Sequence, residues 1–175
     1  MRNTGDKFRL LFVGVLLFVW AVVIFAFSAN TGEESQGLSD GAIVWILETF
    51  VPGYFGWDVA KQLEVQQLLS YPIRKAAHFG EYAVFGVLAR SFFVQLFAAG
   101  SSLGRGKVKE ALFRKESIAA IALSVLYAGF DEFHQLFVGG RSGQFSDVII
   151  DATGSITGIL IASLICFARA RRGRK

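Results

Sequence analysis

The sequence predicts an all-α membrane protein with four transmembrane helices and short amphipathic helices in the first extracytoplasmic loop. Three observations lead to this fold class. Apolar residues make up 53% of the 175 residues, and 18 residues are Phe, which is more apolar surface than a soluble domain of this length can bury. Four stretches are long enough to cross a bilayer. Basic and acidic residues are also segregated along the chain, as membrane orientation requires.

The four predicted spans form a single domain over residues 1–175. A crossing helix needs about 20 predominantly apolar residues, and lipid offers no partner for unpaired backbone groups, so each span must be helical. The spans cover residues 8–27, 73–98, 117–138 and 145–168. A cleavable signal peptide is the alternative for the first span. Its apolar run is longer than the usual signal core, which favours a retained anchor.

The segment between the first two spans has a pattern of its own. Residues 40–50 and 56–69 show the apolar spacing of short helices, separated by Pro52 and Gly53. Aromatic residues in this segment suit the interface between lipid and water. We therefore expect two short amphipathic helices on the outer membrane surface, with Pro72 at the start of the second span.

The basic residues predict the orientation. They outnumber acids at the N-terminus, in the 99–116 loop and over residues 169–175, whereas residues 30–72 contain six acids and Lys61 as the single basic residue. The positive-inside rule then places both termini and the 99–116 loop in the cytoplasm. Arg90, near the inner end of the second span, is expected to reach the inner headgroups.

The strongest functional signal is a group of ionisable residues from three spans and one loop, all predicted in the outer third of the membrane. Each ionisable group inside a bilayer costs about 2.5 to 3.5 kcal/mol on the insertion scale, so such groups pair, line a wet cavity or carry a function. The predicted catalytic residues are His78, Glu81, Asp131, Glu132 and His134, and the predicted ligand-binding residues are Arg74, Lys75, Tyr82, Gln135, Arg141, Ser142, Asp147 and Asp151.

These residue types suit chemistry on a phosphate-bearing headgroup. The two arginines would bind phosphate, which the planar guanidinium matches well. His78 or His134 would act as general acid or base near neutral pH. Asp131 and Glu81 would orient a histidine or position a water molecule. The alternative is an ion-pair network that only holds the helices in register.

That network makes a specific prediction about the arginines. Arg74 and Arg141 would neutralise Asp131, Asp147 and Asp151, so Arg74 should contact at least one of these aspartates across helices. On the fourth span, small residues at a four-residue spacing predict close packing against another helix.

The sequence predicts no dedicated metal site and leaves the cofactor open. A divalent ion is the alternative, because a three-residue spacing puts two ligands on one helix face. Its ligands would be His78, Glu81, Asp131 and His134. Nucleic acid is not expected as a partner, because the basic residues lie next to apolar spans and so match lipid headgroups.

Three sequence blocks resemble the VanZ-like family of bacterial membrane proteins. They read FAFSANTGEES, IRKAAHFGEYAVFGVL and DEFHQLFVGGRSGQFSDVIIDATGSITG, in the family's order. The family commonly has Asn before the last glycine region, where this chain reads Asp151-Ala152-Thr153-Gly154. The resemblance implies a multi-pass protein of the bacterial plasma membrane with a cell-envelope role. One relative is linked to resistance to the glycopeptide teicoplanin, and no established reaction comes with the family.

The expected function is therefore binding of a lipid-linked or amphiphilic cell-envelope ligand near the extracytoplasmic face, with a possible link to glycopeptide resistance taken from the resemblance. The alternatives are a membrane-embedded hydrolase or transferase acting on a lipid headgroup, and a small transporter. The expected partners are membrane lipids and a lipid-linked envelope precursor or lipoglycopeptide. The sequence leaves open whether the protein is an enzyme and whether it forms oligomers.

Overall fold

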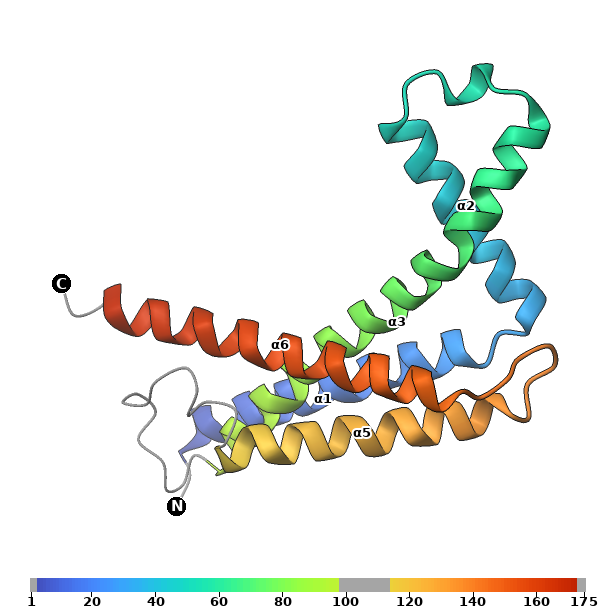
Figure 1. The fold of residues 1–175 in the computed structure, drawn as a ribbon. Helices are drawn as coiled ribbons and strands as arrows, with labels where there is room; N and C mark the ends of the chain where they lie inside the picture. The colour runs from blue at the N-terminus through green and yellow to red at the C-terminus, as the bar shows by residue number, and fades with distance from the viewer. Residues whose placement is uncertain (1–2, 98–113, 173–175) are drawn as a thin grey trace.

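A computed structural model of the chain describes residues 3–97 and 114–172, and Figure 1 shows that they fold into helices. This confirms the all-α prediction. The elements are α1 (Thr4–Ser28), α2 (Gly32–Phe50), the short 3₁₀ helix η1 (Tyr54–Gly56), α3 (Val59–Phe97), α5 (Lys115–Gln135) and α6 (Phe145–Arg172).

Helices α1, α3, α5 and α6 form a bundle, and a helical hairpin made of α2, η1 and the first part of α3 projects from one end of it (Figure 1). The predicted spans fall on α1, α3, α5 and α6. The boundaries differ by a few residues, except that α3 begins at Val59, well before the predicted start at residue 73. Helix α6 packs against α3 and α5, and α1 packs against α3. The predicted 99–116 loop lies mostly outside the described residues.

Helices α3 and α6 approach each other closely because glycines face the neighbouring backbone. A Cβ atom on Gly154 would collide with the carbonyl oxygen of Phe79, and one on Gly158 would collide with that of Ala83. Gly86 of α3 faces Ser155 of α6 in the same way. The predicted packing role of the small residues on the fourth span is confirmed.

The hairpin has its own small core of Ile43, Leu47 and Tyr54. Helix α2 begins at Gly32, earlier than the predicted start at residue 40. The reason is a capping box, in which Thr31 accepts a hydrogen bond from the Glu34 amide at 3.3 Å and the Glu34 carboxylate accepts one from the Thr31 amide at 2.8 Å.

The predicted break before the second span is wrong. Helix α3 runs without interruption from Val59 to Phe97, with Pro72 inside it. A proline removes one backbone hydrogen bond and normally kinks or ends a helix. Here Leu69 and Ile73, on either side of Pro72, both pack against the hairpin core. This packing holds the helix on both sides of the proline.

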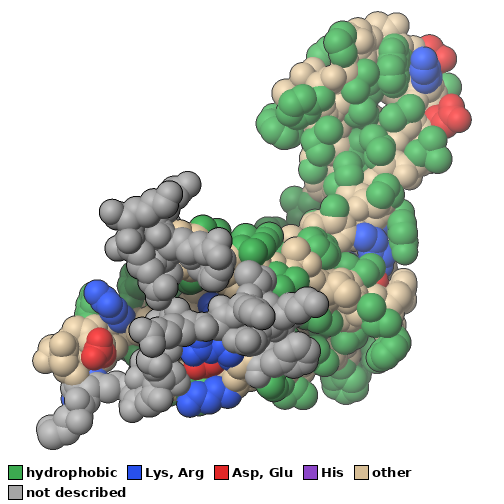
Figure 2. Space-filling model, turned by 60° about the vertical axis from the view of Figure 1, so that its left-hand side comes forward, with side chains coloured by type: hydrophobic (Ala, Val, Ile, Leu, Met, Phe, Trp, Pro, Cys, Tyr) green, Lys and Arg blue, Asp and Glu red, His purple; other side chains and the backbone are tan. Residues whose placement is uncertain are grey.

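The outside of the molecule is strongly apolar. Phe8 and Phe18 of α1 are each 69% exposed, and hydrophobic side chains are spread over the visible hairpin and the nearby bundle in Figure 2. By length and composition, Thr4–Ser28 and Phe145–Cys166 can span a membrane. With the apolar exterior, these two helices point to a membrane protein.

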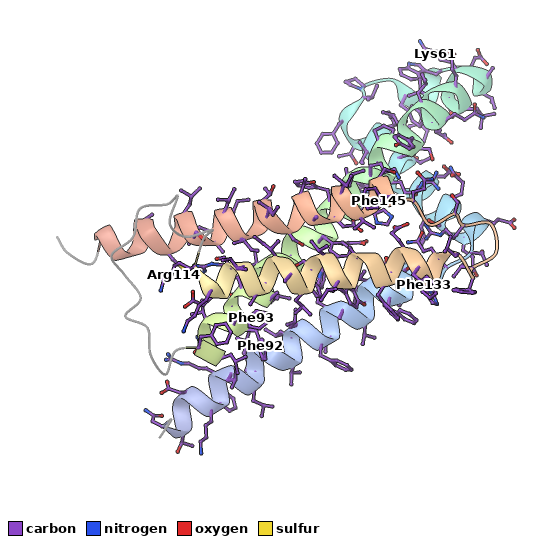
Figure 3. The ribbon with its side chains drawn as sticks, turned by 60° about the horizontal axis from the view of Figure 1, so that its bottom comes forward. Lys61, Phe92, Phe93, Arg114, Phe133 and Phe145 are labelled. Atoms are coloured by element: carbon purple, nitrogen blue, oxygen red, sulfur yellow. The ribbon has the colours of Figure 1, made fainter. Side chains whose placement is uncertain are left out.

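The two ends of the bundle carry different residues. Phe133 and Phe145 lie near the end where α5 is joined to α6, and Arg114 lies at the other end (Figure 3). At that other end, Arg90 is only 9% exposed, and its Nε donates to Ser117 Oγ at 3.2 Å. The prediction that Arg90 reaches outward to headgroups is therefore wrong, because its guanidinium has a partner on α5.

Candidate functional site

A cavity of about 260 Å³ lies where the hairpin joins the bundle. Helices α1, α2 and α3 form most of its lining, and α5 and the α5–α6 connection each contribute one residue. Its lining is amphiphilic. The ionisable lining residues are Arg74, His78, Glu81, Asp131 and Arg141, and the larger apolar ones are Ile24, Phe27, Leu38 and Ile73.

Arg141 is held in the cavity by the connection between α5 and α6. Gly140, with φ of 74°, turns the chain just before it. The Arg141 side chain then donates to the carbonyl oxygens of Asn30 at 3.1 Å and Phe27 at 3.2 Å. Burial lowers the pKa of Arg141, and the nearby charge of Arg74 lowers it further. Two guanidinium groups of like charge therefore line one cavity.

Arg74 does not make the predicted contact with an aspartate. Its Nη2 donates to Gln36 Oε1 at 3.0 Å and to Ser70 Oγ at 3.5 Å, and none of the ion pairs within 4.0 Å among the described residues includes it. Gln36 belongs to α2, so the hairpin supplies the partner of Arg74. This correction removes Arg74 from the predicted ion-pair network.

The cross-helix ion pair at this level is formed by the neighbouring residue. Lys75 of α3 pairs with Asp147 near the start of α6. The two side chains are 16% and 9% exposed. A lysine therefore makes the cross-helix pair at this level, and neither arginine of the predicted network pairs with an aspartate within 4.0 Å among the described residues.

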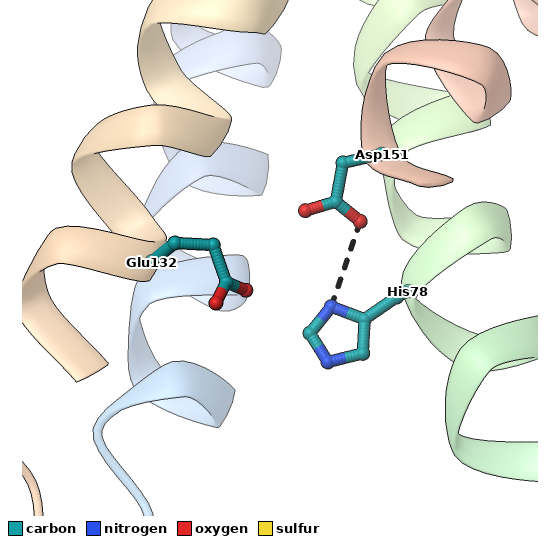
Figure 4. A group of neighbouring side chains, drawn as sticks. All are labelled: His78, Glu132 and Asp151. Atoms are coloured by element: carbon teal, nitrogen blue, oxygen red, sulfur yellow. Dashed lines mark ion pairs between the residues drawn. The ribbon is translucent and has the colours of Figure 1, made fainter. Parts of the chain in front are cut away.

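A second polar group lies between α3, α5 and α6, and Figure 4 shows its three side chains. His78 Nδ1 lies 3.6 Å from Asp151 Oδ1. Glu132 approaches from α5, and one potential ligand atom from each of the three residues lies within 4.8 Å of the others. The Gln144 amide donates to Glu132 Oε2 at 2.7 Å and orients that carboxylate.

Asp131 lies next to this group and also lines the cavity. It is 1% exposed, and its Oδ2 accepts a weak hydrogen bond from Gln135 at 3.4 Å. Buried polar atoms nearly always find hydrogen-bond partners. Several in this region have none among the described residues: Ser28 Oγ, His78 Nδ1, Tyr82 Oη, Asp131 Oδ1 and both Asp151 carboxylate oxygens. This concentration points to a place where a ligand, ion or water completes the structure.

Two predicted residues lie apart from these groups. The His134 ring packs on Phe25 of α1 with centroids 4.6 Å apart, and Ser142 is exposed on the connection. The sequence-based metal set of His78, Glu81, Asp131 and His134 is therefore not the set that the fold brings together. Adjacent residues on α5 point about 100° apart, and Glu132, not Asp131, joins His78.

Sequence analysis missed the contribution of the hairpin. Gln36 binds Arg74, and Ser35, Leu38 and Ser39 of α2 line the cavity. The capping box at Thr31 was the available signal that a helix begins early enough to include them.

Comparison with known proteins gives one match. A family model described as VanZ/LLP1 matches residues 12–166. No curated protein and no solved structure matches the chain.

Proposed function

The chain belongs to the VanZ/LLP1 family, and on that premise we propose that it binds a lipid-linked or other amphiphilic cell-envelope ligand through an anionic headgroup. The binding site is the cavity where the hairpin joins the bundle. Binding of an envelope precursor or lipoglycopeptide there would account for a link to glycopeptide resistance.

The observation that carries this proposal is the pairing of two arginines with apolar side chains in one cavity. Arg74 and Arg141 donate to neutral oxygens, and neither has a carboxylate within 4.0 Å among the described residues. A guanidinium has five N–H donors, so donors remain for a phosphate or carboxylate headgroup. Ile24, Phe27 and Leu38 suit the first carbons of an attached chain.

The membrane topology belongs to the same proposal. All four long helices cross the bilayer, both termini are cytoplasmic, and the hairpin and cavity face the outside. Two features support this arrangement. The termini lie at the same end of the bundle in Figure 1, away from the hairpin. The acids outnumber the bases over residues 30–72, which contain the hairpin.

The test measures lipid binding to the purified protein in detergent. Native mass spectrometry identifies co-purified amphiphiles, and titration with a phosphate-bearing lipid compares the wild type with Arg74→Gln and Arg141→Gln. Each substitution removes charge-assisted hydrogen bonds, so we expect affinity to fall by about 10-fold or more. Arg9→Gln, an exposed arginine on α1, is the matched control and should bind as the wild type does. Equal binding of neutral and anionic lipids by the wild type would refute the proposal.

A hydrolase is the second candidate, and one contact favours it. His78 lines the cavity and faces the buried Asp151 carboxylate at 3.6 Å, as a base oriented by an acid does in hydrolytic sites. A hydrolase would release headgroup or phosphate from the bound lipid with turnover, and His78→Gln would stop the release. Binding without release by the wild type would leave the binding function alone.

A further inference from the structure

The buried carboxylates near His78 exceed the cations that neutralise them. Asp131, Glu132 and Asp151 are 1%, 5% and 0% exposed. Among the described residues, none of these three carboxylates has a lysine or arginine nitrogen within 4.0 Å. Lys75, the lysine at this level, pairs with Asp147 instead. Burying an uncompensated carboxylate is costly. His78, whose Nδ1 lies 3.6 Å from Asp151 Oδ1, is the basic group beside them, and one imidazole cannot neutralise three carboxylates.

The geometry of three residues fits a single ion. His78, Glu132 and Asp151 come from three different helices, and one ligand atom of each lies within 4.8 Å of the other two. Zinc binds nitrogen and oxygen ligands at about 2.0 to 2.2 Å, which separates neighbouring ligand atoms by roughly 3 to 4 Å. The side chains therefore need small movements to share an ion.

The donor atoms are also available. His78 Nδ1 and both oxygens of Asp151 are buried without a hydrogen-bond partner among the described residues. Glu132 accepts from the Gln144 amide through Oε2 and from Gln135 at a long 3.4 Å through Oε1. A backbone amide that fixes one oxygen of a ligating carboxylate is typical of metal sites.

We propose that His78, Glu132 and Asp151 form a binding site for a divalent first-row cation such as Mn²⁺ or Zn²⁺. One imidazole and two carboxylates, with no thiolate, are the ligand set that these ions accept. Three protein ligands leave at least one coordination position for water or a ligand. Because His78 also lines the cavity, the ion lies beside it. The site does not depend on the proposed lipid-binding function.

The test uses the full chain in detergent, stripped with a chelator and titrated with Mn²⁺ alone. Loss of the free Mn²⁺ signal in electron paramagnetic resonance should show one ion per chain in the wild type. Glu132→Gln and Asp151→Asn should each weaken Mn²⁺ binding by about 100-fold. Loss of a residue that only hydrogen-bonds to a metal ligand can cost as little as about 10-fold. Glu64→Gln is the matched control, because Glu64 is an exposed carboxylate of α3 outside both the cavity and the three-residue group, and it should bind as the wild type does.

A second measurement uses the wild type alone, so it does not depend on whether a variant folds. Pulsed resonance of the Mn²⁺-loaded wild type should show nitrogen coupling to one imidazole, as binding to His78 requires. No bound ion, no nitrogen coupling, or equal loss in Glu64→Gln would each overturn the metal site. Arg74→Gln should weaken anionic lipid binding and leave Mn²⁺ binding unchanged, so failure of the lipid proposal is seen separately.

Discussion

The two ends of the bundle both bury charged side chains, but they treat them differently. At the Arg114 end, Arg90 donates to Ser117 Oγ at 3.2 Å, and Arg114 Nε lies 3.5 Å from the buried carboxylate of Glu116. At the hairpin end, Asp151 is fully buried and neither carboxylate oxygen accepts a hydrogen bond among the described residues. Buried charges that have partners, as at the Arg114 end, are what stable helix packing requires.

The difference separates bracing from binding. A buried charge with a partner lowers the free energy of the folded state relative to leaving that charge alone. A buried charge without a partner raises the free energy of the folded state. Unsatisfied buried polar groups of this kind are characteristic of sites that bind a ligand, an ion or water. The comparison therefore predicts that substitutions at the two ends change stability and function in different proportions.

The largest expected effect concerns the sides of the membrane on which the two ends lie. With Cys166→Ser as background, an impermeant maleimide should label Asp58→Cys in intact cells. In the same background, Lys115→Cys, exposed at the start of α5, should react only after the membrane is opened. The contrast should be nearly all-or-none, because the reagent cannot cross lipid. Labelling of Lys115→Cys alone in intact cells would reverse the proposed orientation.

The next effect removes the packing that both ends share. Gly158→Leu should abolish the close approach of α3 and α6, because a side chain there would collide with the Ala83 backbone. Overpacking usually costs about 1 to 3 kcal/mol, and more when backbone must move. Gly80→Leu is the control, since no atom lies within 4 Å of its added Cβ. Folded protein, measured by size-exclusion chromatography in detergent, should fall for Gly158→Leu only.

A moderate effect is expected at the Arg114 end. Arg90→Met should destabilise the protein by about 2 kcal/mol, because a hydrogen bond from a charged donor is lost and Ser117 is left less satisfied. Lipid binding at the other end should keep its affinity at temperatures where the variant is folded. Thermal unfolding and lipid titration on the same preparation give both quantities. A loss of affinity as large as the loss of stability would show that the ends are coupled.

The smallest effect on stability is expected at Asp151. Asp151→Asn should change the free energy of unfolding in chelator by less than about 1 kcal/mol, or raise it. Relief from burying a carboxylate offsets the loss of its pairing with His78 Nδ1 at 3.6 Å. Binding of Mn²⁺ to the site formed by His78, Glu132 and Asp151 should nevertheless be strongly weakened. Chemical denaturation without metal measures the stability. Destabilisation equal to that of Arg90→Met would mean that Asp151 braces the fold.

Sequence reasoning succeeded where composition or depth decides the outcome. Apolar runs located the four long helices, and the shared depth of His78 and Asp151 brought them together near one end. It failed where the outcome depends on the direction in which a side chain points around its helix. Lys75 pairs with Asp147 while Arg74 turns to Gln36, and Glu132 joins His78 while Asp131 faces the cavity. Neighbouring positions differ by about 100°, and only the packed neighbours determine which direction is used.

The uninterrupted course of α3 also determines how far the protein extends. Its 39 residues, at a rise of about 1.5 Å each, make a rod of roughly 58 Å. The hydrocarbon layer is about 30 Å thick, so no modest tilt can submerge the whole rod. In the proposed topology, in which α3 crosses the bilayer, about half of it lies outside the lipid tails and carries the hairpin. In that arrangement an amphiphile that leaves the membrane for the cavity would meet Gln36 where the hairpin joins the bundle, at the level of the headgroups.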